Sequence, residues 1–279
     1  MDTGTGHTLR TVGATRYVTP LREGGSLPGL VEADDDGLYV LKFSGAGQGV
    51  RALMAEVLAG ELARALELPV PELVLMDLDP ALGRAEPDLE IKELIDRSPG
   101  INLGVDFLPG ALPFDPWLSP DPGPELAASI VWFDALVTNV DRSPRNANLL
   151  VWHRRLWCID HGAALYVHHT WRDPAGHARR PFEQVRDHIL LPFAGSIEEA
   201  DARLAAAVDE RLLARIAGLL PDEWLTVAPA TDGSGRSLGV DDSRAAYVEY
   251  LRRRLEAPRD FVTTAEQARL EEARRDRVA

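Results

Sequence analysis

Short apolar runs separated by turn residues dominate the first part of the chain. Three of them, at residues 16–18, 30–33 and 38–43, are rich in leucine, valine and tyrosine. Aspartates and a glycine at residues 34–37 separate the last two runs, and an Asp-Gly turn between β-prone segments is typical of a hairpin. The pattern therefore predicts three strands between residues 15 and 43.

A helical pattern follows these strands. Between residues 51 and 67 the apolar side chains recur at intervals of three and four residues, which favours an amphipathic helix. Pro69 and Pro71 end this helix. Residues 73–76 are again apolar, and we expect this segment and residues 89–94 to form strands.

A proline-rich segment divides the chain. Residues 109–124 hold six of the 20 prolines, a composition that interrupts regular structure, so we place a domain boundary between residues 108 and 109. Residues 125–138 predict a helix, 139–148 a polar loop, and 149–159 a hairpin. Beyond Pro181 the pattern is helical, with helices expected near 182–192, 197–207, 209–219, 242–256 and 263–277. The fold class is therefore α+β, with a mixed first half and a helical second half.

Composition narrows the function classes. The chain has 279 residues, of which 45% are hydrophobic, and 30 basic against 44 acidic residues give a net charge of −14. Such an acidic chain argues against general nucleic-acid binding. A single cysteine, Cys158, excludes an intrachain disulfide and cysteine-built metal sites. We find neither a signal peptide nor a membrane-spanning run of about 18 apolar residues, and we expect a soluble, cytoplasmic protein with no membrane partner.

Two aspartates carry the chemistry that stands out. Asp141 lies in the polar loop and is followed by Asn146 and Asn148, while Asp160 follows the predicted hairpin. Both ends of a short hairpin lie on the same side, so Asp160 and the region of Asn148 are expected to be neighbours. Phosphoryl transfer needs one Asp at the attacking hydroxyl, and an Asn with a second Asp at magnesium. The pair indicates a kinase-like enzyme that uses ATP.

Further candidate residues lie in the first half. Lys42 ends the third predicted strand, and a lysine there suits nucleotide phosphates if it points into a cleft. Glu56, or alternatively Glu61, lies on the following helix and would hold that lysine extended. The turn formed by Gly24, Gly25 and Ser26 permits close approach of backbone N–H groups to phosphates.

In their order and spacing, these segments resemble the HipA-like kinases, bacterial members of the protein-kinase-like and phosphoinositide-kinase-like fold group. The resemblance covers about residues 20–225. It is carried by Val40-Leu41-Lys42-Phe43, by the helix of Glu56 with its exit Leu66-Glu67-Leu68-Pro69, by Ile91-Lys92-Glu93-Leu94-Ile95-Asp96-Arg97, and by Asn139-Val140-Asp141-Arg142 followed by Ile159-Asp160-His161-Gly162.

The resemblance implies ATP and Mg²⁺ as cofactors and gives each segment a role. Lys42 would hold the α- and β-phosphates, with Glu56 orienting it. Asp141 would position or deprotonate the acceptor hydroxyl, and Asp160 would bind the metal together with Asn146 or Asn148, a choice that the spacing leaves open. A hinge strand would present backbone to adenine and a carboxylate to ribose, and its residues are Glu93, Leu94, Ile95 and Asp96.

The implied fold has two lobes like those of protein kinases. Residues 1–108 would form a nucleotide-binding lobe with an antiparallel sheet and a helix, and residues 109–279 a mainly helical catalytic lobe. Because the chain starts almost at the nucleotide lobe, we expect the N-terminal subdomain of full-length HipA toxins to be absent. The implied activity is serine/threonine protein phosphorylation. Alternatives are a small-molecule or lipid kinase of the same fold, a nucleotide-binding pseudokinase that acts as an interaction module, and a scaffold without nucleotide.

Overall fold

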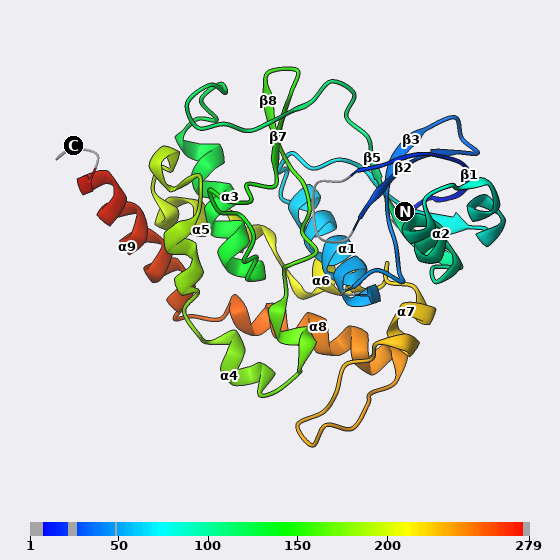
Figure 1. Ribbon diagram of the computed structural model, residues 1–279. Helices are drawn as coiled ribbons and strands as arrows, with labels where there is room; N and C mark the ends of the chain where they lie inside the picture. Colours follow the sequence, from blue (N-terminus) through cyan, green and yellow to red (C-terminus); the bar gives the residue numbers. More distant parts are fainter. Residues whose placement is uncertain (1–7, 22–26, 48, 276–279) are drawn as a thin grey trace, which may run out of the picture.

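The computed structural model describes residues 8–21, 27–47 and 49–275. Most strands lie before residue 107 and most helices after it (Figure 1). The predicted division into a mixed first half and a helical second half is confirmed. Among the described residues, we find no helix with the length and apolar character needed to cross a membrane.

Five strands of the N-terminal part form a closed barrel in the order β1-β2-β3-β5-β4. Their bounds are β1 Thr11–Pro20, β2 Gly29–Ala33, β3 Leu38–Lys42, β4 Leu73–Leu78 and β5 Gly100–Asp106. The first four lie where the sequence predicts strands. The pairing of β1 with β4 is parallel and the other pairings are antiparallel, so the barrel departs from the predicted antiparallel sheet where it closes.

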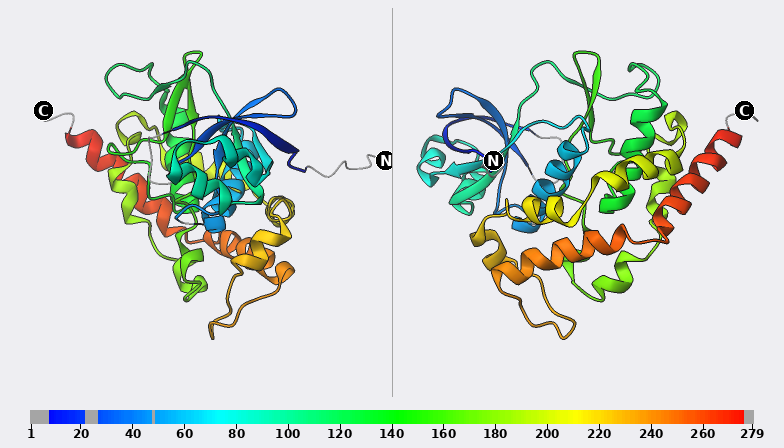
Figure 2. Two further views of the ribbon diagram at one scale, coloured as in Figure 1. Left: turned by 45° about the vertical axis from the view of Figure 1, so that its right-hand side comes forward. Right: turned by 180° about the vertical axis from the view of Figure 1, so that it is seen from behind.

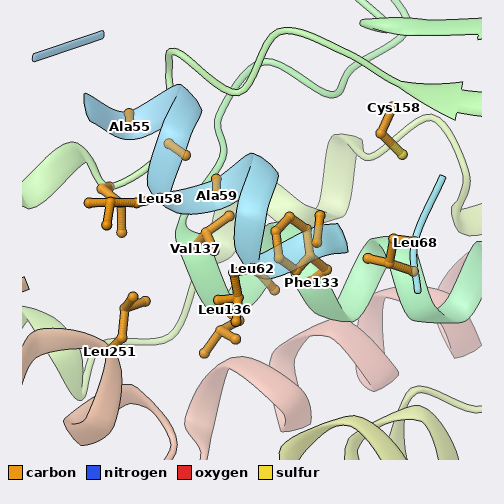
Figure 3. Packing of buried hydrophobic residues seen from close by; sticks show 14 of the residues in the cluster. Ala55, Leu58, Ala59, Leu62, Leu68, Phe133, Leu136, Val137, Cys158 and Leu251 are labelled. Atoms are coloured by element: carbon orange, nitrogen blue, oxygen red, sulfur yellow. The ribbon is translucent and has the colours of Figure 1, made fainter. Parts of the chain in front are cut away.

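Helix α1 (Gly49–Ala65) confirms the predicted helix but is buried on nearly all sides, unlike the amphipathic helix that the spacing predicts. Figure 3 shows why: Leu58 and Leu62 of α1 pack among Phe133 and Leu136 from α3 (Pro124–Val137), close to Leu251 from α8 (Val240–Arg254). Since helices of the second half cover α1, it belongs to the main core of the molecule. Burial on most sides is expected of a helix in such a position.

The predicted strand at residues 89–94 is wrong, because this segment forms helix α2 (Leu89–Asp96). Asp88 caps the helix by accepting a hydrogen bond from the backbone N–H of Glu90 at 3.0 Å. The buried residues Ile91, Leu94 and Ile95 follow helical spacing rather than strand alternation. The strand of this region is β5, which begins four residues after the helix ends.

The second half contains a small sheet and further helices (Figure 2). Strands β6 (Leu112–Pro113), β7 (Leu149–Trp152) and β8 (Arg155–Cys158) form the sheet, and β7 and β8 confirm the predicted hairpin. The helices are α3, α4 (Pro174–Ala178), α5 (Ile197–Ala207), α6 (Glu210–Ala217), α7 (Asp222–Val227), α8 and α9 (Asp260–Arg275). Short 3-10 helices occupy Pro80–Ala85, Tyr166–His169, Glu183–Asp187 and Leu191–Phe193.

One predicted helix of the second half is wrong. Residues 182–192 form two short 3-10 helices instead of an α-helix. Pro192 has no N–H to donate, and Leu190 donates its N–H to the His188 side chain at 3.1 Å rather than to a helical carbonyl. The segment is irregular because its backbone donors are used elsewhere.

Candidate active site

A lysine and two carboxylates from three separate elements meet at one point. Lys42 at the end of β3 places its Nζ 2.5 Å from Oε2 of Glu56 on α1. The same Nζ lies 2.7 Å from Oδ1 of Asp160, two residues after β8. The structure thus brings together three of the residues that the sequence selects, although 118 positions separate Lys42 from Asp160.

The pair of Lys42 and Glu56 is held inside the protein. The side chains are 15% and 2% exposed, respectively. Burial disfavours both charges, but each group stabilises the other: the carboxylates of Glu56 and Asp160 raise the pKa of Lys42, and the Lys42 charge holds the pKa of Glu56 well below its usual range. Both groups are therefore charged at neutral pH, as phosphate binding by a lysine requires.

Glu56 has a second neighbour, His161. The His161 Nδ1 lies 3.6 Å from Oε1 of Glu56, and its buried ring packs edge-on against Phe133 with 6.0 Å between ring centroids. Glu61, the alternative partner proposed for Lys42, instead lies 3.2 Å from the guanidinium of Arg64. Glu56 is thus the helix carboxylate that contacts the lysine.

Asp141 lies in the loop between α3 and β7 and is partly buried. The side-chain oxygen of Asn139 accepts its backbone N–H at 3.2 Å. Burial, together with the charge of Asp160, raises the pKa of the Asp141 carboxyl above its ordinary value. Asp160 is therefore close enough for its charge to act on Asp141.

One of the two candidate asparagines, Asn148, contacts Asp160. The Asn148 Nδ2 donates to the backbone carbonyl of Asp160 at 3.5 Å, a long contact, and the N–H of Ile159 donates to the Asn148 carbonyl at 3.0 Å. Asn146 is exposed and closes a tight turn with Ser143 through two backbone hydrogen bonds of 3.1 Å. Carboxamide and carboxylate oxygens, the groups that Asn148 and Asp160 carry, are the ligand type that a hard cation such as magnesium takes.

The described residues contain no group of three or more histidine, cysteine, aspartate or glutamate side chains placed to hold a metal ion. A magnesium site of the kind expected here needs fewer protein ligands, because phosphate oxygens and water complete the coordination. One carboxylate and one carboxamide are therefore compatible with such a site.

The four predicted hinge residues do not join this site as a strand. Glu93, Leu94, Ile95 and Asp96 lie on α2, where the carbonyls of Glu93 and Ile95 accept the N–H groups of the two residues after the helix at 3.1 and 3.0 Å. Leu94 and Ile95 are buried. The predicted hinge role required a strand at these residues, and they form a helix instead. Gly24, Gly25 and Ser26 lie outside the described residues.

Sequence reasoning missed Asn102, which supports the site from β5. Its buried Oδ1 accepts the N–H of Ser44 at 2.7 Å, and its Nδ2 donates to the carbonyls of Ser98 and Gly100 at 2.9 and 2.8 Å. The segment after Lys42 is thereby tied to the neighbouring strand. In the sequence, a polar residue between Ile101 and Leu103 could have indicated this role. A carboxamide buried among apolar residues must have hydrogen-bond partners.

Comparison with known proteins decides the family. A family model described as HipA-like kinase matches residues 15–240. The chain belongs to the HipA-like kinase family. It is therefore a kinase, as its sequence predicts. A search of curated proteins finds no match for this HipA-like kinase.

Solved structures similar to this HipA-like kinase include other kinases. The Helicobacter pylori proinflammatory kinase CtkA is 13% identical with a TM-score of 0.48, and the alignment covers 88% of this chain and 95% of that chain. Two structures of the Golgi casein kinase, one with Mn/ADP bound, are 13% identical with TM-scores of 0.45. Their alignments cover 94% of this chain and 72% and 73% of those chains.

Proposed function

We propose that this HipA-like kinase transfers the γ-phosphoryl group of ATP to a hydroxyl group and requires Mg²⁺, with serine or threonine side chains of a protein as acceptors. The observation that carries the proposal is the meeting of Lys42 with Glu56 and Asp160 at 2.5 and 2.7 Å. A charged lysine held between two carboxylates, one of them 45% exposed, is the arrangement that nucleotide phosphates and a cation require.

In this proposal Lys42 contacts the α- and β-phosphates and Glu56 keeps its side chain extended. Asp160 and Asn148 hold the metal, and we favour Asn148 over Asn146 because it contacts Asp160. When bound, magnesium would neutralise charge on the β- and γ-phosphates. Little covalent chemistry is asked of the protein itself, so positioning and charge account for the rate.

Asp141 is proposed to orient the acceptor hydroxyl and to accept its proton. Its partial burial and its raised pKa suit a carboxylate that takes up a proton during transfer. The acceptor class follows from the family resemblance, and small-molecule or lipid hydroxyls are the alternative acceptors. A pseudokinase is disfavoured because Lys42, Asp141 and Asp160 are all present.

We further propose two lobes that meet near residue 108, with nucleotide bound between them. The β-rich residues up to 108 would form the nucleotide-binding lobe, and residues 109–279 the catalytic lobe. In place of α2, the segment directly after β5, at residues 107–109, is proposed to face adenine. It is the direct chain connection from the barrel to the sheet whose β7–β8 hairpin joins Asn148 to Asp160.

The test uses purified protein with γ-labelled ATP, Mg²⁺ and a mixture of protein acceptors. We expect label transfer that EDTA abolishes and that Asp141→Ala lowers at least 100-fold, with ATP binding retained. Asp187→Ala, which changes an exposed aspartate in a 3-10 helix, serves as the matched control and should keep full activity. Nucleotide binding without transfer or hydrolysis by the unmodified protein would refute the proposal and favour the pseudokinase.

A further inference from the structure

A fully buried carboxylate lies beneath the candidate active site without belonging to it. Asp134 is 0% exposed on α3, in the otherwise apolar run Val131-Trp132-Phe133-Asp134-Ala135-Leu136. An isolated charge is costly to bury, so a carboxylate in such a position needs strong partners. The groups around Asp134 must therefore stabilise its charge.

Both oxygens of Asp134 accept two hydrogen bonds. Oδ1 accepts from Asn139 Nδ2 at 2.9 Å and from Arg142 Nη2 at 3.3 Å. Oδ2 accepts from Arg142 Nε at 2.7 Å and lies 3.0 Å from His188 Nε2. The His188 Nδ1 accepts the N–H of Leu190, which leaves the ring proton on Nε2 for donation to Asp134. Each oxygen of the Asp134 carboxylate thus has two hydrogen-bond donors.

The partners of Asp134 lead directly to the residues of the candidate site. Asn139, held by Oδ1, accepts the backbone N–H of Asp141 at 3.2 Å. The Arg142 Nη1 donates to the carbonyl of Asn148 and, at 3.1 Å, to the carbonyl of Ile159, which precedes Asp160. Two successive hydrogen bonds therefore connect Asp134 to the backbone at Asp141, at Asn148 and at the peptide group between Ile159 and Asp160.

The backbone at two of these positions needs such support. Asn148 and Asp160 have φ angles of 47° and 54°, the left-handed region that residues other than glycine rarely adopt. A residue held there costs about 1–2 kcal/mol, so surrounding contacts must fix it. The guanidinium of Arg142 contacts the carbonyl groups at both ends of the hairpin, next to these residues.

We propose that Asp134 is the positioning residue of the active site, acting through Arg142 and Asn139 to hold Asp141, Asn148 and Asp160 in one geometry. The inference rests on the proposed function for its catalytic readout, but its structural readout is independent of any reaction. Asp134 touches neither substrate nor metal in this scheme. Its contribution is to fix two left-handed residues and one backbone N–H.

The test removes both buried charges together. In Asp134→Leu/Arg142→Met, two apolar side chains replace the ion pair, an exchange that buried pairs often tolerate. Asn139 and His188 lose their shared acceptor in this variant. The matched control is Asp201→Leu/Arg259→Met, which removes another ion pair, of 2.6 Å, between α5 and the start of α9. Arg142→Lys is the second variant: it keeps a cation beside Asp134 but lacks the planar fork that reaches two carbonyls.

The first readout is amide hydrogen exchange at Asp141 and Ile159 without ligands. We expect exchange at least 10-fold faster at both amides in Asp134→Leu/Arg142→Met and at Ile159 in Arg142→Lys, and unchanged exchange in the control pair. The second readout is ATP turnover, where we expect kcat at least 100-fold lower and the Mg²⁺ concentration for half-maximal rate at least 10-fold higher. ATP binding measured without Mg²⁺ should stay within threefold.

The outcomes separate the two ideas. Unchanged exchange at Ile159 in a folded Arg142→Lys variant overturns the positioning role, whatever the activity. The variants could show the expected exchange while the unmodified protein shows no turnover. That result would support the positioning role and refute the proposed function. Full turnover and an unchanged Mg²⁺ requirement in the double variant also overturn the inference.

Discussion

The substitution Glu56→Gln tests the center of the candidate site. It keeps the size of the side chain and one oxygen acceptor but removes the charge 2.5 Å from the Lys42 ammonium. Breaking a buried ion pair from one side costs about 3–5 kcal/mol. Lys42 keeps a second carboxylate, Asp160, at 2.7 Å, so the lower end, about 3 kcal/mol, is expected. For a chain of this size that corresponds to a Tm lower by about 6–12 °C.

The assay is urea denaturation followed by tryptophan fluorescence, with calorimetry for Tm. Glu249→Gln is the control, because Glu249 pairs with Arg252 at 2.7 Å while both side chains are about 40% exposed. An exposed pair contributes about 0–1 kcal/mol, so the control should unfold nearly as the unmodified protein does. Equal effects of the two substitutions would refute the reasoning.

The pH dependence gives an independent check of the same pair. Because the pKa of Glu56 is lower in the folded than in the unfolded protein, its contribution is complete above the unfolded pKa of about 4.5. The contribution is lost as pH falls from there toward the folded pKa. We therefore expect the stability difference between the unmodified protein and Glu56→Gln to be constant near neutrality and to shrink below pH 4.5. A constant difference down to pH 3 would contradict the assignment.

Three further outcomes are expected. Asn148→Ala should lower Mg²⁺-dependent turnover at least 100-fold and Asn146→Ala less than threefold, and the reverse order would move the metal to the exposed turn. The turnover rate should fall on acidification at a pH above 3.8, the ordinary Asp pKa, because the pKa of Asp141 is raised; a rate that is flat to pH 3.8 would exclude Asp141 as the base. Arg254→Met should lower the free energy of unfolding by about 2–4 kcal/mol, because buried Arg254 donates to four backbone carbonyls at 2.6–3.1 Å; denaturation midpoints measure this, and no change would refute it.

The sequence predicts elements well where periodicity and turn chemistry agree. The β7–β8 hairpin is confirmed, and its two turn residues, His153 and Arg154, are both at positive φ. Helix α2 was mistaken for a strand because the alternation of apolar and charged residues over 89–92 fits a short strand as well as a helix, and the cap at Asp88 decides between them. Closure of the barrel by β1 and β4 was not predictable, since it depends on pairing between distant segments.

The candidate site was likewise predictable only in part from the sequence. Lys42, Glu56 and Asp160 were found from residue type and order, and the structure adds their contact. Asn146 and Asn148 could not be separated by counting, because the choice depends on which backbone turns toward Asp160. The only indication of Asp134 in the sequence is a lone carboxylate in an apolar helix. Its partners could not be predicted, because they come from loops on both sides of the hairpin.

The all-round burial of α1 bears on how inhibitors of this kinase would work. A compound that acts by displacing α1 would have to expose Leu53, Leu58 and Leu62, at a cost of about 1.5–3 kcal/mol for each side chain. Few small molecules bind tightly enough to supply that energy in addition to their own affinity. Useful compounds are therefore expected to compete for the nucleotide or acceptor position with the helix in place. Resistance to them would arise around those positions rather than along α1.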